Sequence, residues 1–505
     1  MNLSRRKVLK VGGGSAALLA TVGCDQLPRE LRLFSGPTNP TGPFQPPVAA
    51  EIDPVTHVLN RVAFGPRPGD YERANKLGPT PEQAAAVYLE KQLHPETIKD
   101  ADAEYAVRRF ETLRQPLGEL FEYQDELLHN ELMRGTLVRA VLSERQLYEA
   151  MVQFWSDHFN IDPSKGDCKW LKVADDRDVV RVHALGNFSD LLRASALSPA
   201  MLWYLDGRVN RRARPADKPN ENYARELLEL HTLGVHGGYT QRDVMEVARC
   251  LTGWSVRAKN QKPYFEIGSV EFKLPQHDCG AKVVLGENIP AIPADAGRSQ
   301  REELGRMEMD RVLQIVTRHP ATARHLSTKL CCRFIADEPP AAAVTAVAAT
   351  FAASRGDIRA TLRTLFATEE FQRLRGNKFK RPFNFIVSAL RATGASTNAG
   401  MEIIDYLRRM GHAPFNYPTP DGYPEPAAPW LGTLLWRWNF ALALGENKLK
   451  GTKIEFTSLQ QNAGGDLGLM SHLLGRKPTA EETQAYHNSG AGLALVLASP
   501  AFQRC

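Results

Sequence analysis

From about residue 55 to the end of the chain, apolar residues recur at spacings of three and four, and this pattern constrains the fold more than any other feature. Side chains at that spacing share one face of an α-helix, which becomes buried when helices pack together. A chain of 505 residues with 43% hydrophobic content can bury a large core. We therefore predict a mainly α fold, with one large multi-helix domain over residues 51–505. The clearest helical segments are residues 81–92, 117–133, 143–159, 221–233, 241–251, 321–335 and 431–444.

One stretch has the character of β-structure. Residues 270–274 and 282–285 are short runs rich in apolar and β-branched side chains, and they flank a turn at residues 277–280. Short runs of this kind on either side of a turn are typical of a hairpin. We predict a small β-hairpin inserted in the helical body at about residues 260–290.

The N-terminus has the pattern of an export signal. Residues 4–10 form a twin-arginine pattern, and the apolar stretch at 11–22 is shorter than the roughly 20 residues that span a bilayer. The stretch ends in a sequence that resembles a lipobox, although Thr21 stands where Leu is usual. We predict export by the twin-arginine translocase, cleavage before Cys24, lipid attachment at Cys24 and a periplasmic, membrane-anchored protein. The alternative is a chance cysteine in an ordinary signal peptide.

Removal of the predicted signal peptide, residues 1–23, changes the charge of the chain. The segment holds four basic residues and no acidic ones, so the formal charge falls from +6 to +2. A nearly neutral chain lacks the basic footprint of a nucleic-acid-binding protein, and we exclude that class. Residues 24–50 hold six prolines between Pro28 and Pro47, which predicts an extended tether between the anchor and the globular body.

The export route and the cysteines bear on cofactors. Twin-arginine export moves folded proteins, often after a cofactor has been inserted, so it raises the expectation of a metal or redox group modestly. Six cysteines remain after Cys24, and none has the spacing of a zinc site. We interpret the adjacent Cys331 and Cys332 as core thiols rather than a vicinal disulfide.

The segment NENYARELLELHTLG, residues 220–234, is strongly amphipathic. On a helical wheel its tyrosine, leucines and histidine fall on one side, and its glutamates, Asn222 and Arg225 fall on the other. Asn220 can cap the N-terminus, and Gly234 fits the C-terminal stop. Two interpretations remain open. The polar side either faces solvent, or it lines a cleft in which Glu226 is an acid or base.

Three histidines are candidates for a metal site. His158 projects into the apolar stripe of residues 143–159, His183 lies on an inward side, and His277 adjoins Asp278 in the predicted turn. A buried histidine needs a hydrogen-bond partner or a metal, because an unsatisfied polar group is costly to bury. One hypothesis is a divalent metal held by these histidines, with Asp278 as an orienting group and Glu226 as a general base. The alternative is that each histidine is satisfied separately in the core.

Two loops complete the candidate sites. The basic loop at 207–218 precedes a predicted helix, so Arg211, Arg212 and Arg214 could hold a phosphate or sulfate, or could simply be solvated. Residues 411–430 hold six prolines and several aromatic side chains. They form either a binding platform for a polymer or a rigid strap across the helices. The aromatic residues are Phe415, Tyr417, Tyr423 and Trp430.

Several motifs together resemble the bacterial "domain of unknown function 1800" (DUF1800) family. The resemblance spans nearly everything from residue 55 onward. It departs from the family pattern at Ser156 and Asp157, where the family motif reads closer to FWHNHF, so a metal site that needs two histidines there is in doubt. The motifs lie at residues 57–66, 154–159, 183–186, 220–254, 277–282, 319–323, 378–382 and before Trp430.

The resemblance implies a largely helical, exported protein but brings no established activity. Genes of this family are commonly neighbours of an exported family, "domain of unknown function 1501" (DUF1501), that resembles sulfatases and alkaline phosphatases. We predict a lipid-anchored envelope protein that is accessory to such a partner in processing extracellular polymers or surface material. The alternative is a metal-assisted hydrolase with a His, Asp and Glu site. Whether the chain is an enzyme stays open at this point.

Overall fold

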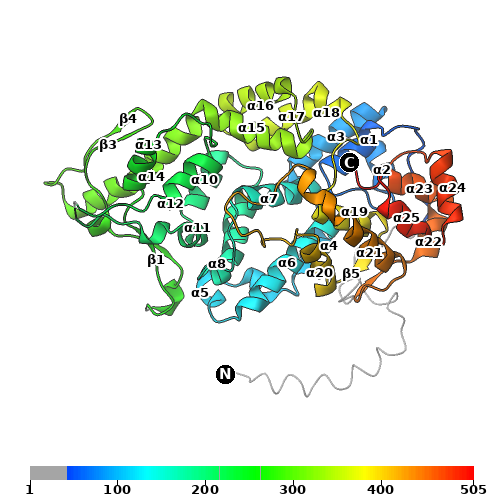
Figure 1. Cartoon of the computed structure of the whole chain (residues 1–505), viewed down its shortest axis with the longest axis horizontal. Coiled ribbons are helices and arrows are strands. Elements are labelled where there is room, and N and C mark those ends of the chain that lie inside the picture. Colours follow the sequence, from blue (N-terminus) through cyan, green and yellow to red (C-terminus); the bar gives the residue numbers. More distant parts are fainter. Residues whose placement is uncertain (1–41, 215, 262) are drawn as a thin grey trace, which may run out of the picture.

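The structure is a computed structural model that describes residues 42–505 except residues 215 and 262. The predicted signal peptide, Cys24 and most of the predicted tether lie outside the described residues. Helices make up most of the described chain, and the strands are short (Figure 1). The predicted mainly α fold is therefore confirmed.

The helices of the N-terminal part end at residue 250. Two of them continue directly into π-helical turns, at η7 (Asp176–Val180) and η9 (Leu227–His231). The α-helices are α1 (Pro54–Arg61), α2 (Asp70–Asn75), α3 (Pro81–Leu93), α4 (Ala101–Val107), α5 (Leu117–Leu120), α6 (Asp125–Leu142), α7 (Gln146–His158), α8 (Cys168–Asp175), α9 (Arg181–His183), α10 (Phe188–Ala196), α11 (Pro199–Tyr204), α12 (Asn222–Glu226) and α13 (Gln241–Cys250).

The helices of the C-terminal part begin at residue 298. Figure 1 places the last of them at the opposite end of the molecule from the strands β1 to β4. They are α14 (Arg298–Arg318), α15 (Pro320–Phe334), α16 (Ala341–Ala353), α17 (Ile358–Ala367), α18 (Glu369–Arg373), α19 (Pro382–Ala392), α20 (Met401–Arg409), α21 (Leu434–Gly445), α22 (Phe456–Asn462), α23 (Asp466–Leu474), α24 (Ala480–Asn488) and α25 (Gly492–Ala498).

Short 3₁₀ turns connect several of these helices, and two of the predicted helices are broken. The predicted helix at 117–133 is interrupted between α5 and α6, and the segment at 431–444 enters through η12 before α21 begins. The 3₁₀ turns are η5 (Pro95–Thr97), η6 (Glu111–Arg114), η8 (Gly207–Val209), η10 (Tyr264–Glu266), η11 (Leu274–Gln276) and η12 (Ala428–Thr433).

The six strands of the described residues form three separate antiparallel pairs. β1 (Trp254–Val256) pairs with β2 (Val270–Phe272), β3 (Lys282–Val284) with β4 (Glu287–Ile289), and β5 (Ser396–Thr397) with β6 (Thr452–Lys453). A small β insertion is present, but the two predicted runs do not pair with each other. The turn between them is buried against α13 and α14, so each run pairs with another segment.

The helix α7 lies in the middle of the molecule (Figure 1). Its Trp155 packs in one hydrophobic cluster, built mainly by α1, α3 and α8 to α18, and its Ala150 packs in a second cluster, built mainly by α6 and α19 to α25. Because both sides of α7 are covered, polar residues opposite its apolar stripe are also buried or partly buried. Glu149 is 6% exposed and binds Arg181, at 3.0 Å.

Two further findings complete the description. No helix in residues 42–505, as far as they are described, is long and apolar enough to cross a membrane. The six cysteines after Cys24 are all free thiols, and Cys331 is buried, in agreement with core thiols rather than a vicinal disulfide.

Candidate functional site

Four polar side chains from three elements meet beside the C-terminal end of α7, and we call them the Lys329 cluster. His158 comes from α7, His231 from the π-helical turn η9, and His325 and Lys329 from successive turns of α15. The Nζ atom of Lys329 lies 3.0 Å from Nδ1 of His158. The imidazole rings of His231 and His325 lie 6.1 and 6.4 Å from that of His158, measured between centroids.

The hydrogen bonds fix which nitrogen of His158 carries the proton. Its Nε2 lies 3.1 Å from the carbonyl oxygen of His231, and a carbonyl can only accept, so Nε2 carries the hydrogen. Nδ1 then holds a lone pair and accepts a hydrogen bond from Lys329. The Nε2 of His325 donates in the same way to the carbonyl oxygen of Leu230, at 3.1 Å. Carbonyls at the end of a helix lack intrahelical partners, and here the histidines satisfy them.

His231 is the least satisfied member of the cluster. Its side chain is 1% exposed, and neither ring nitrogen has a hydrogen-bond partner among the described residues. Leaving a buried polar group without a partner costs about 1–3 kcal/mol. A helix that served only to pack would be more stable with an apolar residue here, and π-helical turns are frequent at functional sites.

Burial keeps the three imidazoles neutral. It lowers the pKa of His231 to about 3 and that of His325 to about 4, and the Lys329 ammonium group acts in the same direction on both. Burial and Lys329 also hold the pKa of His158 well below its usual range. Burial lowers the pKa of Lys329 itself, and the nearby carboxylates only partly oppose this shift.

The charge of Asp421 acts on both Glu226 and Lys329. Burial raises the pKa of the Glu226 carboxyl group, and the negative charges of Glu229 and Asp421 add to the effect. Asp421 also acts on Lys329, where its charge raises the pKa. Burial thus shifts Glu226 and Lys329 toward their neutral forms, with a raised pKa for the carboxyl group and a lowered pKa for the amine. The charge of the exposed Asp421 raises the pKa of both groups.

A network of ion pairs adjoins the cluster and fixes the proline-rich segment 411–430, which we call the strap. Arg381 lies 2.8 Å from Asp157 of α7 and 3.4 Å from Glu425 of the strap, and Arg333 lies 3.4 Å from the same Glu425. Burial disfavours a charged Glu425, but the two guanidinium groups outweigh it and hold its pKa at about 2. Glu425 is therefore a permanent anchor of the strap at neutral pH.

The aromatic side chains of the strap are mostly buried against their own helices. Tyr423 and Trp430 are 7% and 4% exposed, and Trp430 stacks on the ring of His412 at 4.9 Å. Gly422 has a φ of +71°, and a Cβ at this position would lie 2.0 Å from the carbonyl oxygen of Asp157. Only glycine allows the strap to approach α7 so closely, so the segment is a strap rather than an open platform.

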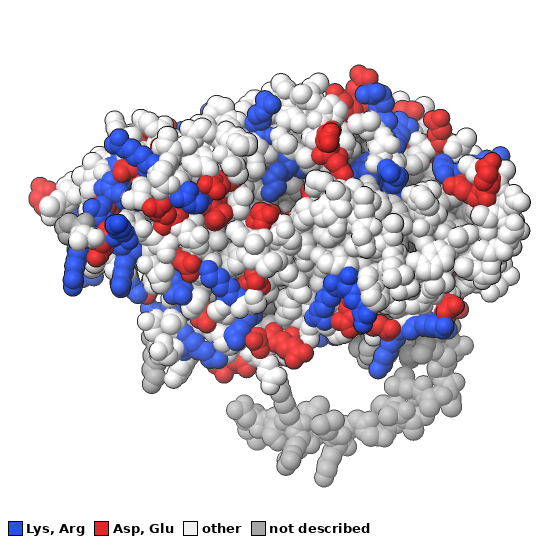
Figure 2. Space-filling model, viewed as in Figure 1, with Lys and Arg blue, Asp and Glu red and all other residues white. Residues whose placement is uncertain are grey.

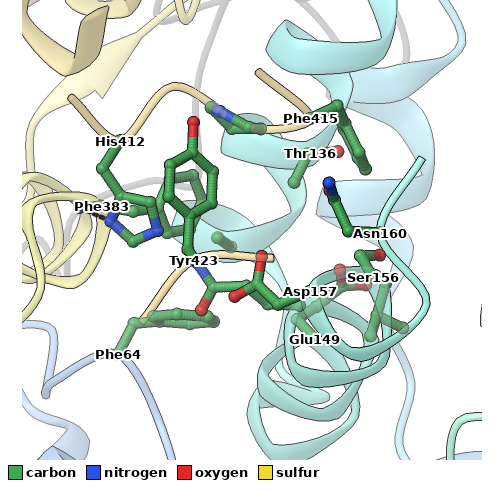
Figure 3. A pocket seen from close by; sticks show the side chains of 14 residues that line it. Phe64, Thr136, Glu149, Ser156, Asp157, Asn160, Phe383, His412, Phe415 and Tyr423 are labelled. Carbon is green, nitrogen blue, oxygen red and sulfur yellow. Dashed lines mark hydrogen bonds between the residues drawn. The ribbon is translucent and has the colours of Figure 1, made fainter. Parts of the chain in front are cut away.

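A small cavity of about 30 Å³ lies between the strap and α7. Figure 3 shows the side chains that line it, with Asp157 and Tyr423 in the middle of the view. Ser156 also lines it, and its hydroxyl has no hydrogen-bond partner among the described residues. The volume suits one or two water molecules and no larger ligand.

His277 and Asp278 belong to a different centre. His277 is buried, with Nδ1 2.9 Å from the carbonyl oxygen of Thr252 and Nε2 3.3 Å from Glu308. The carboxylate of Asp278 contacts Arg212 and lies 2.7 Å from Arg249, rather than contacting the imidazole. Burial opposes a charged Asp278, but Arg249 holds the pKa well below its usual range.

The predicted metal ligands are not brought into one group. His158 is in the Lys329 cluster, His277 faces Glu308, and His183 is half-buried at the C-terminal end of α9. Within the described part of the chain, no group of three or more His, Cys, Asp or Glu side chains is arranged to hold a metal ion. The physical reason is that each of the two buried histidines already has partners on its own neighbouring elements.

The three arginines predicted to bind an anion do not share one environment. Arg212 is engaged by Asp278, whereas the side chains of Arg211 and Arg214 are exposed. The backbone N–H of Arg214 donates to Asp217, at 2.9 Å, which shapes the loop. Anion binding by this loop stays a prediction.

Reasoning from the sequence named His158 as a candidate but did not name the other members of its cluster, His231, His325 and Lys329. One signal was present, since His325 and Lys329 are four residues apart on a predicted helix and so share a face. The convergence with His158 was not visible, because the two contacts join residues 73 and 171 positions apart in the chain.

Comparison with known protein families identifies the family of this chain. A family model described as "Protein of unknown function (DUF1800)" matches residues 57–504, which include every member of the Lys329 cluster and the strap. Searches of curated proteins and of solved structures give no match. Since the family model covers nearly the whole chain, the protein belongs to the DUF1800 family, whose activity is not established.

Proposed function

We propose that the Lys329 cluster is the acid–base centre of a hydrolase. The observation that carries this proposal is a partly buried lysine whose hydrogen-bond partner is a neutral histidine, His158, at 3.0 Å. No carboxylate of a described residue lies within ion-pair distance of Lys329. An enzyme obtains a lysine base at neutral pH by this kind of desolvation.

The chemistry assigns one role to each group. Lys329 in its neutral form takes a proton from water while the water oxygen attacks the substrate. Glu226, whose pKa is raised by burial, is the acid that protonates the leaving group. Paired groups with pKa values displaced toward each other are typical of acid–base sites. Asp421, exposed on the strap, acts electrostatically on both groups.

His158 is a positioning residue in this scheme. Its Nε2–H is tied to the carbonyl oxygen of His231, so its lone pair at Nδ1 stays directed at Lys329. The proposed reaction uses the acid and base of the chain itself. Participation of a divalent metal stays a separate prediction. The three histidines predicted as its ligands, His158, His183 and His277, do not lie together in the structure.

The test is a screen of sulfate, phosphate and carboxylate esters with the purified mature protein and the variants Lys329→Met and Glu226→Gln. Loss of a general acid or base typically lowers kcat by 10²–10⁴-fold. Lys282→Met is a poor control because Lys282 is a buried ion-pair partner, so the matched control is the exposed Lys450→Met. Hydrolysis that persists in both site variants would contradict the proposal.

An accessory role is the second candidate, and the tight fit of the strap favours it. The cavity beneath the strap has room only for water, and the surrounding charges pair with one another. In this role the protein presents its surface to a sulfatase- or phosphatase-like exported partner of the DUF1501 kind. Co-purification of such a partner with the mature domain, without any hydrolysis by the domain alone, would favour it over the first candidate.

We also propose that the protein is exported by the twin-arginine translocase and held in the periplasm by lipid at Cys24. The support is the sequence pattern at residues 4–24 and the resemblance to exported family members. Figure 2 shows basic and acidic side chains interspersed around a broad uncharged area on one face of the molecule. Membrane fractionation of the wild type and Cys24→Ala tests the anchor, and an unchanged membrane fraction for the variant would refute it.

A further inference from the structure

A polar pocket away from the Lys329 cluster lies between α2, α3 and the segment 97–99. Its volume is about 510 Å³, within the range of roughly 300–1,000 Å³ that small organic ligands occupy. Leu59, Ala74 and Ile98 form an apolar part of the lining. A pocket with one apolar wall and several polar groups has the composition of a ligand site.

The floor of this pocket carries an excess of positive charge. Asp70 is surrounded by three guanidinium groups: those of Arg67 and Arg391 lie 3.3 Å away, and that of Arg73 is also in contact. The second acidic group, Glu144, contacts Arg67. Arg73, Arg391, Asp70 and Glu144 line the pocket, and Arg67 lies behind them, so this ion-pair network sets three arginines against two carboxylates. Burial together with the charge of Arg67 lowers the pKa of Arg391 to about 10.

The rim adds two amines that have no ion-pair partner among the described residues. Lys91 and Lys99 line the pocket, and both side chains are exposed. Tyr88 lines the wall, and its hydroxyl makes no hydrogen bond within the described chain. Unpaired amines and a free hydroxyl around a positively charged floor are the groups that an anion with further polar atoms can engage.

We propose that this pocket binds a small organic anion, a sugar-sized molecule that carries a carboxylate, sulfate or phosphate group. Lys91 and Lys99 hold the charged group, and the hydroxyl of Tyr88 hydrogen-bonds to a polar atom of the same molecule. The apolar wall packs against the carbon face of its ring. The proposal does not depend on the Lys329 centre, because none of its residues belongs to that cluster.

The test is calorimetric titration of the mature protein with glucuronate, a sulfated disaccharide and glucose 6-phosphate, with glucose and inorganic sulfate beside them. We expect at least one organic anion to bind, with an affinity that falls as salt rises, and glucose not to bind. Lys91→Gln combined with Lys99→Gln should weaken binding about tenfold or more, and Tyr88→Phe about threefold to tenfold.

The matched control is Lys450→Gln combined with Lys477→Gln, two exposed lysines that do not line the pocket. This variant should bind as the wild type does. Three results would overturn the proposal: no organic anion binds the folded wild type, the pocket variants bind unchanged, or inorganic sulfate binds as tightly as the sulfated disaccharide. Carboxylate-only or phosphate-only binding would support it and identify the source of the charge.

Discussion

Two centres in the protein use the same kinds of residue, a lysine beside a histidine. Only the Lys329 cluster holds a lysine that has no ion-pair partner among the described residues. Around His277, the ammonium group of Lys282 lies 2.7 Å from Glu308, so cation and anion neutralise each other. In the Lys329 cluster, the lysine faces a neutral His158 instead. Burial of a matched pair keeps both members charged, whereas burial of an unmatched lysine lowers its pKa.

The two centres differ in whether their ionisable groups can exchange protons near neutral pH. His277 and Asp278 are adjacent in the sequence, which favoured them as a site. In the structure the imidazole faces Glu308 and the carboxylate pairs with Arg249. Asp278 stays ionised because Arg249 holds its pKa low. A group that is fixed in one protonation state by strong partners stabilises the fold but cannot exchange protons near neutral pH.

The largest change in the free energy of unfolding is expected from the ion pair of Lys282 and Glu308, beside His277. Glu308→Gln leaves the fully buried Lys282 without its counter-charge, and breaking a buried ion pair costs roughly 3–5 kcal/mol. Chemical denaturation of the wild type and the variant measures this difference. The double variant Lys282→Met with Glu308→Leu should recover most of it, and a loss below about 1 kcal/mol in Glu308→Gln would show that the pair is not needed.

A smaller effect concerns pH and the neutral histidines. The pKa of His231 is about 3 in the folded protein against an ordinary 6.5, so the unfolded chain binds the additional proton first. Stability that is present above pH 6.5 should therefore be lost as the pH falls toward 3, with a slope of about 1.4 kcal/mol per pH unit. His231→Phe should reduce the slope by that amount, as measured by denaturation between pH 4 and 6.5.

The matching control is Asp278→Asn, because its lowered pKa has the opposite consequence. A carboxylate with a depressed pKa contributes stability above its unfolded value of 3.8, and that contribution is lost only below it. The slope between pH 4 and 6.5 should therefore be unchanged in Asp278→Asn. An equal slope in His231→Phe and the wild type would mean that His231 is charged in the folded state.

The smallest change in stability is expected at Lys329. Lys329 makes no ion pair within the described chain, so its removal relieves the cost of burying an amine without breaking an ion pair. Lys329→Met should therefore lie within about 1 kcal/mol of the wild type or be more stable. The same denaturation series measures it. A loss of several kcal/mol would place Lys329 with the structural ion pairs and would remove the contrast between the two centres.

Much of the fold could be predicted from the sequence, because amphipathic periodicity is a local property. The helices at α3, α13 and α15 lie close to their predicted bounds, and the spacing of Thr240 and Asp243 gives the capping box at the start of α13. The wheel for residues 220–234 also placed the buried side correctly. It missed the π-helical turn, which changes the residues per turn without changing composition.

The candidate site was less accessible to sequence reasoning, because it depends on tertiary contacts. The polar side of α7 reads as exposed on a wheel, but the strap covers it, and the close approach at Gly422 makes that possible. The ion pairs of Arg381 with Asp157 and Glu425 join segments far apart in the chain. No spacing rule reports such contacts.

The most direct test of the acid–base centre is the titration of Lys329 itself. Side-chain NMR of the mature protein with ¹³C-labelled lysine, assigned by the absence of one signal in Lys329→Met, would follow this amine from pH 6 to 11. The account predicts a midpoint below the ordinary lysine value of 10.5, because burial lowers the pKa of Lys329. A midpoint at or above 10.5 would contradict it and leave the cluster as a structural feature of the helical core.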